Sequence, residues 1–219
     1  MTTTVRKVAL TYAHGINING NLYLFREWHE VREFFNKVVK EFKLSKDRRL
    51  IVYSHYLQYE FQAMKKQFNF IEVFNNGSER KVLTALTDDG IEFRCSYMLS
   101  GKNLSKTAED LTEHKIAKLD GDLDYELLRT PETPLTDKEI QYILHDILIV
   151  EYYIREEMAR NGNNITRLQL TNTGKVRHFI RSNTVYNKDK KTGTKYKRLM
   201  KNLKMETEER QPGDDNSIS

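Results

Sequence analysis

The stretch TDKEIQYILHDILIVEYYIREEMA, residues 136–159, is the most regular part of the sequence. Thr136 and Glu139 form the pattern of a capping box, and apolar residues then recur at three- and four-residue steps, so the stretch predicts one long helix. Tyr142 and Asp146 are four residues apart and therefore share a face of that helix. Because Asp146 is surrounded by apolar residues, its carboxylate needs a partner, which is either a metal ion or a local ion pair or cap.

Upstream of this helix, the sequence alternates between expected strands and helices. Val5–Tyr12 and Asn21–Phe25 are rich in β-branched and aromatic residues, and the linking HGINING suits a tight connection, so this part predicts a hairpin. A helix over 27–42 follows, and the order strand, strand, helix, strand, helix up to Phe68 favours a mixed sheet with helices packed on it. The other expected elements are strands at 50–54, 71–74, 81–86 and 91–97 and helices at 57–68 and 103–111.

Two segments lack regular patterns. Residues 114–135 contain GDLDY and TPETP, whose turn-forming residues predict an ordered loop. The last residues, METEERQPGDDNSIS, are polar and acidic, and we expect them to be disordered.

Composition excludes several classes of protein. With 219 residues, 38% hydrophobic and 31% charged, the chain fits one soluble globular domain or slightly more. The single cysteine, Cys95, excludes a disulfide framework, a CxxC redox pair and a cysteine-rich zinc site, and we expect it to be a buried thiol. No stretch approaches the ~20 apolar residues that cross a bilayer. These features predict a protein of a reducing cytoplasm that makes no membrane contact.

The charge is concentrated near the C-terminus. Formal net charge is +5, but residues 175–204 contain eleven bases and one acid, a net +10, which leaves −5 for the remainder. Tyrosines and other aromatic residues are interleaved with these bases, so nucleic acid is the expected partner, with a solvated linker as the alternative. The bases that we expect to bind nucleic acid include Lys175, Arg177, Arg181, Lys195, Lys197 and Arg198.

A strand-to-helix junction and several later segments resemble one protein family. IVYSHYLQYEFQAM, residues 51–64, resembles an exonuclease motif in which a strand ends in His-Asn-Leu and a helix opens with aromatic-acid-Phe, and the spacing of Tyr142 and Asp146 resembles another. The order and spacing of these and the segments that follow resemble the exonuclease half of protein-primed family B DNA polymerases from bacteriophages, over residues 5–181. The further segments are EFRCSYMLSGKNLSKTAEDL, HKIAKLDGDLDY, TPLTDKEIQYILHDILIVEYYI and LTNTGKVRHFIR.

This resemblance implies an RNase H-like 3′–5′ exonuclease fold of the α/β class, with a mixed sheet flanked by helices. It implies that Tyr142 orients an attacking water and that Glu60 and Asp146 bind Mg²⁺, in a chemistry where two ions stabilise the attacking and leaving oxygens. Ser96 and Tyr59 would lie near the end of a single DNA strand, and Glu60, Asp146 and Tyr142 would converge at the sheet edge. The implied organisation is an exonuclease-like domain at 1–160, a basic arm toward a polymerase domain at 161–204 and a tail at 205–219.

The sequence departs from this family at several positions. The first motif, Asp-x-Glu on an opening strand before RKVALTYAHGI, is missing, and no acid precedes Glu27. Tyr56 stands where the family has Asn, Cys95 where Asp is usual, and Asp120 where some relatives have a lysine. No motif of the polymerase half is present. We therefore expect a fold without its first strand and a chain without nuclease activity of its own.

Three functions remain open. The first is an exonuclease-domain fragment of a phage-type DNA polymerase that binds DNA, especially single-stranded DNA, beside a separate polymerase subunit in a bacterial cytoplasm. The second is a repurposed phage protein that binds nucleic acid or inhibits a host or phage protein without catalysis. The third is an active nuclease in which Glu92 or Asp122 replaces a missing acid. Mg²⁺ is expected as a cofactor only if activity remains.

Overall fold

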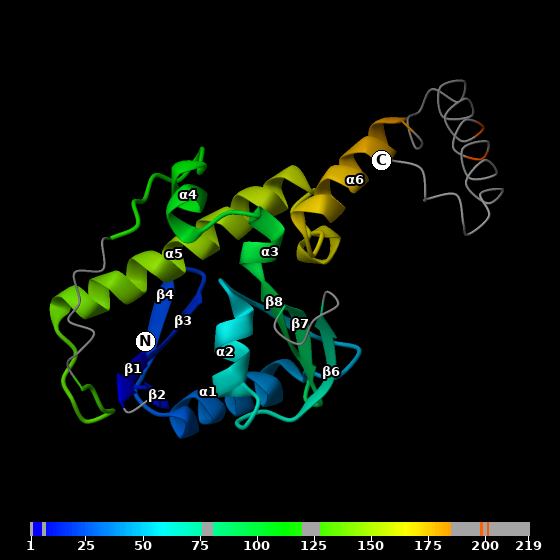
Figure 1. Cartoon of the computed structure of the whole chain (residues 1–219). Helices are drawn as coiled ribbons and strands as arrows, with labels where there is room; N and C mark the ends of the chain where they lie inside the picture. Colours follow the sequence, from blue (N-terminus) through cyan, green and yellow to red (C-terminus); the bar gives the residue numbers. More distant parts are fainter. Residues whose placement is uncertain are drawn as a thin grey trace, which may run out of the picture. The chain divides into compact units, whose positions relative to one another are not determined.

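The structure, a computed structural model, describes residues 2–5, 8–75, 81–119, 128–184, 198 and 201. Contacts within the chain divide it into a first unit up to Asn172 and a second unit from Thr173. The first unit holds the described strands and most of the described helices (Figure 1). None of the helices in the described ranges is long and apolar enough to cross a membrane.

A four-stranded mixed sheet forms the centre of the first unit, as the sequence predicts. Its strands are β5 (Leu50–Ser54), β6 (Phe70–Asn75), β7 (Val82–Thr87) and β8 (Ile91–Cys95), in the spatial order β5-β8-β7-β6. β5 and β8 are parallel, and the other neighbours are antiparallel. β8 ends at Cys95 and not at Tyr97, because the helix α3 (Ser96–Ser100) begins directly after it.

The N-terminal strands form hairpins of their own. β3 (His14–Ile18) pairs with β4 (Asn21–Phe25), and β1 (Thr2–Val5) pairs with β2 (Val8–Thr11). The prediction that Val5–Tyr12 pairs with Asn21–Phe25 is therefore wrong. Asn19 and Gly20 both have positive φ, 51° and 86°, which is the backbone of a two-residue type I′ turn, so the Asn-Gly step closes the hairpin directly before β4. In the described chain, neither hairpin joins the four-stranded sheet.

Two helices cover one face of the sheet. α1 (Trp28–Phe42) begins with a capping box of Glu27 and Glu30 and lies where its apolar spacing predicts. α2 (Leu57–Met64) is shorter than the predicted 57–68. Their buried side chains pack against inward-facing residues of β7 and β8, and burial of each large apolar side chain contributes roughly 1.5–3 kcal/mol. The buried members of this core are Val31, Phe35, Leu57, Met64, Val82, Ala85, Ile91, Phe93 and Cys95.

The long helix α5 (Asp137–Arg160) runs past the hairpin of β3 and β4 (Figure 1). Its side chains belong to three further apolar clusters. Its predicted capping box is present, with Thr136 and Glu139 each bonded to the backbone of the other. In the first half of α5, Ile143 packs against Tyr12 and Ala13, two buried residues directly before β3. The second half packs on α3 and on the loop after α4 (Leu104–Glu109), a helix that lies within its predicted range. α5 thus packs on β3 of the second hairpin.

The connecting segments follow the sequence in part. Residues 114–119 and 128–135 have no regular structure, as predicted, while residues 120–127 lie outside the described residues. A short 3₁₀ turn at Ile165–Arg167 follows α5. The helix α6 (Asn172–Thr184) then leads into the second unit, in a stretch that the sequence suggested to be a linker. The tail that we expected to be disordered lies outside the described residues.

Replacing Gly15 by Val tests the packing of α5 on the hairpin. A Cβ atom at Gly15 would overlap Ile147 Cδ1 and lie 2.8 Å from Ile143 Cγ2. Overpacking of this kind costs about 1–3 kcal/mol, so urea denaturation should show a fall of about 2 kcal/mol in the free energy of unfolding. The control is Asn21→Val at an exposed position of the same hairpin, which should change this free energy by less than ~0.5 kcal/mol. Equal losses in the two variants would contradict the packing.

Candidate functional site

The carboxyl ends of β5 and β8 bring two chain segments together. Ser54 and Cys95 are register partners in the parallel ladder, so the residues that follow them, His55 and Ser96, emerge at the same sheet edge. His55 Nδ1 lies 3.0 Å from Ser96 Oγ. Ser96 is only 1% exposed, so its hydroxyl holds the His55 ring from within the protein. In open α/β sheets, this edge is the usual place for a binding site.

Aromatic rings gather at this edge. Tyr56 and Tyr97 are stacked, with ring centroids 4.1 Å apart and an interplanar angle of 23°. Tyr59 contacts Tyr56 edge-on at 6.1 Å, and it is 71% exposed. The rings therefore run from the half-buried His55 out to solvent at Tyr59. We call His55, Tyr56, Tyr59 and Tyr97 the tyrosine cluster.

The backbone of Tyr56 shows what one departure from the family pattern costs. Tyr56 is the N-cap of α2 and has φ 58° and ψ 48°, the left-handed region. Asn adopts this conformation more readily than other non-glycine residues, and it is the residue that the resemblance leads us to expect here. A tyrosine at this position carries a conformational cost of roughly 1–2 kcal/mol. Stacking on Tyr97 offsets part of that cost.

His55 is held neutral. Burial, helped by the positive charge of Lys118, lowers the pKa of His55 from 6.5 to about 4. The ring is also in edge-on contact with Tyr56 and Tyr97. At neutral pH, His55 therefore acts as an uncharged packing and hydrogen-bonding group within the tyrosine cluster, and Lys118 lies close enough to influence it.

Lys118 joins Tyr142 and Asp146. Its Nζ donates to Tyr142 Oη at 3.0 Å and to Asp146 Oδ1 at 3.2 Å, and it lies 4.4 Å from the centre of the Tyr142 ring. Burial raises the pKa of Asp146 above its ordinary value, although the Lys118 charge acts against this. Burial disfavours the charge of Lys118, but the bonds to Tyr142 and Asp146 outweigh it and raise its pKa.

The structure thus settles part of the sequence expectation. Tyr142 and Asp146 share one face of α5, and Asp146 is ion-paired with Lys118. Metal binding by Asp146 stays a prediction. Glu60 lies in the first turn of α2 and is exposed, and its convergence with Asp146 stays a prediction. Within the described ranges, no three His, Cys, Asp or Glu side chains are grouped to hold a metal ion.

Of the two substitutes suggested for a missing acid, Glu92 is the one that the structure describes, and it is paired elsewhere. Glu92 accepts bonds from Arg94 Nε at 2.7 Å and Arg49 Nη1 at 3.2 Å on the sheet, and these arginines lower its pKa against the effect of burial. Its carboxylate is therefore committed to two cations. Asp122 lies outside the described residues.

Sequence reasoning missed Lys118 and Tyr97. Lys118 belongs to the segment HKIAKLDGDLDY, in which the residues considered from the sequence are Asp120 and Asp122. A loop has no periodicity that tells which of its side chains turns inward, so the lysine could be found only from its place in that motif. The sequence pattern predicts that Tyr97 ends a strand, whereas it lies in α3 and stacks on Tyr56.

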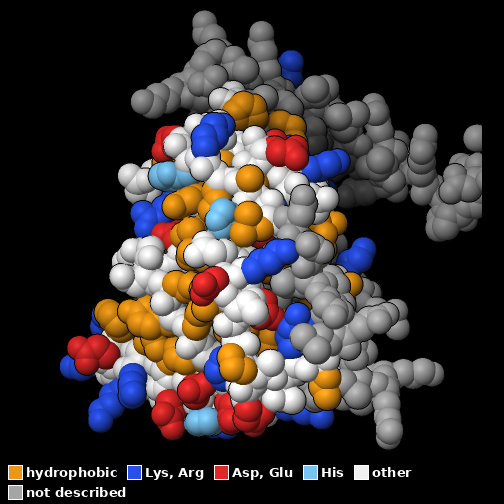
Figure 2. All heavy atoms as spheres, turned by 90° about the vertical axis from the view of Figure 1, so that its left-hand side faces the viewer, with side chains coloured by type: hydrophobic (Ala, Val, Ile, Leu, Met, Phe, Trp, Pro, Cys, Tyr) orange, Lys and Arg blue, Asp and Glu red, His pale blue; other side chains and the backbone are white. Residues whose placement is uncertain are grey.

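The basic residues lie in the second unit. Arg177 and Arg181 are exposed and one helical turn apart on α6, and Lys175 precedes them on the same helix. Arg198 is exposed, while Lys195 and Lys197 lie outside the described residues. On the face shown in Figure 2, described side chains of both signs are interspersed. The charge excess of the chain therefore belongs to the stretch 175–204.

Replacing Lys118 by Met tests the ion pair, because it removes the charge and keeps the length of the side chain. Lys118 is the main influence that lowers the pKa of the half-buried Asp146 carboxyl. We therefore expect the pKa of Asp146 to rise further in Lys118→Met, as measured by carboxyl ¹³C NMR titration. Lys115→Met, three residues earlier in the same loop, should leave the Asp146 titration in place. An unchanged titration in Lys118→Met would rule out the pair.

Comparison with known proteins bears on the fold. No family model matches the chain, and no curated protein matches it. Among solved structures, phi29 DNA polymerase in an orthorhombic crystal form is 16% identical with a TM-score of 0.55, over 78% of this chain and 31% of that chain. The same polymerase with single-stranded DNA gives 17% identity and a TM-score of 0.56, over 78% and 31%. The polymerase with primer-template DNA and incoming nucleotides is 16% identical with a TM-score of 0.56, over 75% of this chain and 31% of that chain.

At this identity the likeness shows the fold alone. The chain spans about a third of the length of the polymerase that it matches. The resemblance predicted from motif order is thereby confirmed at the level of structure: the chain shares its mixed α/β fold with part of a phage DNA polymerase.

Proposed function

We propose that this chain is a single-stranded-DNA-binding module with an RNase H-like 3′–5′ exonuclease fold, a fragment of a phage-type DNA polymerase, and that it does not cut DNA by itself. The fold likeness to phi29 DNA polymerase supports this proposal, and three of the matched structures of that polymerase hold primer-template or single-stranded DNA. The motif order in the sequence supports it independently.

The exposed end of the tyrosine cluster carries the proposal. Tyr59 presents its ring to solvent at the carboxyl edge of the sheet, and Tyr56 and Tyr97 support it from behind. An aromatic platform of this kind stacks on unpaired bases whatever their sequence. The basic residues of the second unit add attraction to phosphates, which is sequence-independent and sensitive to salt.

The lack of activity is proposed from the surroundings of Asp146. A two-magnesium centre needs several carboxylates turned toward the ions. The described residues at this place do not fit that centre, because Asp146 is bonded to the Lys118 ammonium and no group of three possible ligands is formed. Tyr142 is bonded to the same ammonium. We therefore expect the site to hold DNA without binding the ions that would cut it.

Tyr59→Ala should weaken binding of a fluorescent single-stranded oligonucleotide about fivefold or more, since stacking of a base on an aromatic side chain contributes ~1–3 kcal/mol. Fluorescence anisotropy at ~100 mM salt measures the change under conditions where surface charge is partly screened. The matched control is Phe42→Ala, an aromatic residue 56% exposed at the end of α1, which should bind as the unaltered chain does. Equal affinity of all three proteins would remove the tyrosine cluster from the interface.

The purified chain should give no 3′–5′ exonuclease activity on 5′-labelled single-stranded DNA with magnesium or manganese. Loss of one well-placed electrostatic group commonly costs ~10² to 10³ in rate, and here Asp146 is neutralised by Lys118. Denaturing gels resolve the products. A ladder of shortened strands that disappears in Asp146→Ala would overturn this part of the proposal.

A protein partner is a second candidate, favoured by the surface of α6. Val176 and Phe179 are exposed three residues apart on this helix, with Arg177 and Arg181 on it as well. Amphipathic helices of this kind bind in apolar grooves of other proteins. The partner would be a separate polymerase subunit, or the target of a repurposed phage protein. Unchanged DNA affinity in Tyr59→Ala would favour this candidate over the first.

A further inference from the structure

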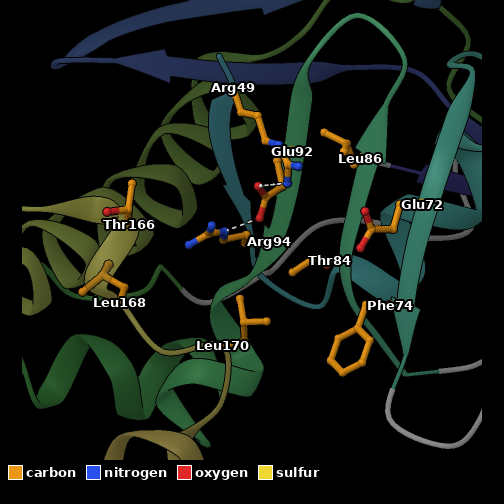
Figure 3. A pocket seen from close by; sticks show the side chains of 10 residues that line it. All are labelled: Arg49, Glu72, Phe74, Thr84, Leu86, Glu92, Arg94, Thr166, Leu168 and Leu170. Carbon is orange, nitrogen blue, oxygen red and sulfur yellow. Dashed lines mark hydrogen bonds and ion pairs between the residues drawn. The ribbon is translucent and has the colours of Figure 1, made fainter. Parts of the chain in front are cut away.

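A cavity lies on the sheet face opposite α1 and α2. Its volume is about 310 Å³, at the lower end of the range for small-ligand sites. Figure 3 shows its walls: Arg49 and Arg94 meet at the Glu92 carboxylate on one side, and Glu72 and Phe74 of β6 stand on the other. None of the residues of the tyrosine cluster lines it.

Strand register fixes the floor of this cavity. Phe74 pairs with Thr84 and Thr84 with Arg94, while Glu72 pairs with Leu86 and Leu86 with Glu92. Two rows of side chains therefore cross three strands on the same face. Since neighbouring strands lie ~4.8 Å apart, the β6 wall and the β8 wall are separated by roughly 10 Å. Leu168, which is buried, closes the cavity from the segment after α5.

The two walls differ in chemistry. On the β8 side, two guanidinium groups share one carboxylate, which leaves a local excess of one positive charge. Arg49 is one-third exposed and, within the described chain, donates through Nε to Lys46 O and through Nη1 to Glu92. A guanidinium has five N–H donors, so Arg49 retains donors for a further acceptor. On the β6 side, Glu72 offers a carboxylate that can accept hydrogen bonds, and the Phe74 ring is 52% exposed.

We propose that this cavity binds one nucleotide whose base carries an exocyclic amino group. The phosphate lies on Arg49 and Arg94, where paired N–H groups suit an anion. The flat base stacks on Phe74 over Leu86, and its amino group donates to Glu72, as cytosine N4 does to acidic side chains. Nucleoside monophosphates with an amino-bearing base, such as dCMP, have this layout of anion, sugar, flat ring and amino group in sequence. The choice of a nucleotide rests on the proposed function, but the site is separate from the tyrosine cluster.

Two sources supply this ligand, a free nucleoside monophosphate or one unit of single-stranded DNA. Titration calorimetry of the full chain with dCMP measures the first. We expect Arg49→Gln and Phe74→Ala each to weaken dCMP binding about tenfold, the usual effect of losing a hydrogen bond to a charged group or a base stack. Both positions are exposed at the cavity mouth. The matched controls, Arg48→Gln and Phe42→Ala, are exposed and do not line the cavity, and they should leave dCMP binding unchanged.

Further ligands separate a nucleotide site from simpler ones. Deoxycytidine, inorganic phosphate and dTMP should each bind about tenfold more weakly than dCMP, because each lacks the phosphate, the base or the amino group. If Arg49→Gln and Phe74→Ala also weaken binding of a (dC)₁₀ oligonucleotide, the site takes a unit of DNA. If they leave the affinity for (dC)₁₀ unchanged, the site takes free nucleotide. Phosphate binding as tight as dCMP, or no dCMP binding up to ~1 mM, would overturn the proposal. Because dCMP is measured alone, this result is independent of whether Tyr59 binds DNA.

Discussion

Parallel pairing of β5 with β8 is the constraint on which the rest of the structure depends. A parallel neighbour cannot be reached by a tight turn, so the chain between the two strands forms α2 and the β6–β7 pair before it returns. Both strands then end at one edge and deliver His55 and Ser96 into hydrogen-bond contact. The same arrangement puts α1 and α2 on one sheet face and leaves part of the other face open as a cavity.

α5 brings the second half of the site, and a buried carboxylate fixes its start. Glu139 is 3% exposed and accepts bonds from Arg129 Nε at 2.6 Å and from the Thr136 amide at 2.9 Å. Burial alone would raise the pKa of Glu139, but the bonds from Thr136 and Arg129 outweigh it and lower the pKa. Breaking such a buried pair costs about 3–5 kcal/mol. Tyr12, two residues before β3, also donates to Glu139. This bond fixes the rotation of α5 about its axis relative to the second hairpin, so that Tyr142 and Asp146 face Lys118.

Sequence reasoning succeeded where one local signal was decisive. The capping box at Thr136 and the apolar spacing of α1 are properties of single segments, and both helices lie where expected. Hairpin pairing depends on which of several Gly and Asn residues makes the turn, and the choice of Asn19 and Gly20 shifted the first strand of the pair to His14–Ile18. The partner of Asp146 could not be named at all, since Lys118 comes from a loop 28 residues away in sequence. Motif order was sufficient to predict the fold likeness, because it integrates many weak signals over most of the chain.

A site that stacks bases on tyrosines and neutralises its own carboxylate with a lysine would bind a DNA strand without cutting it. The most direct test is ultraviolet cross-linking of single-stranded DNA that contains bromodeoxyuridine, followed by mass spectrometry of the modified peptides. Adducts should form on Tyr59, with further adducts on Tyr56 or Tyr97, because these rings contact one another in a cluster that ends in solvent at Tyr59. Adducts confined to residues 175–204 would contradict this, and would mean that the chain binds DNA through its basic stretch alone.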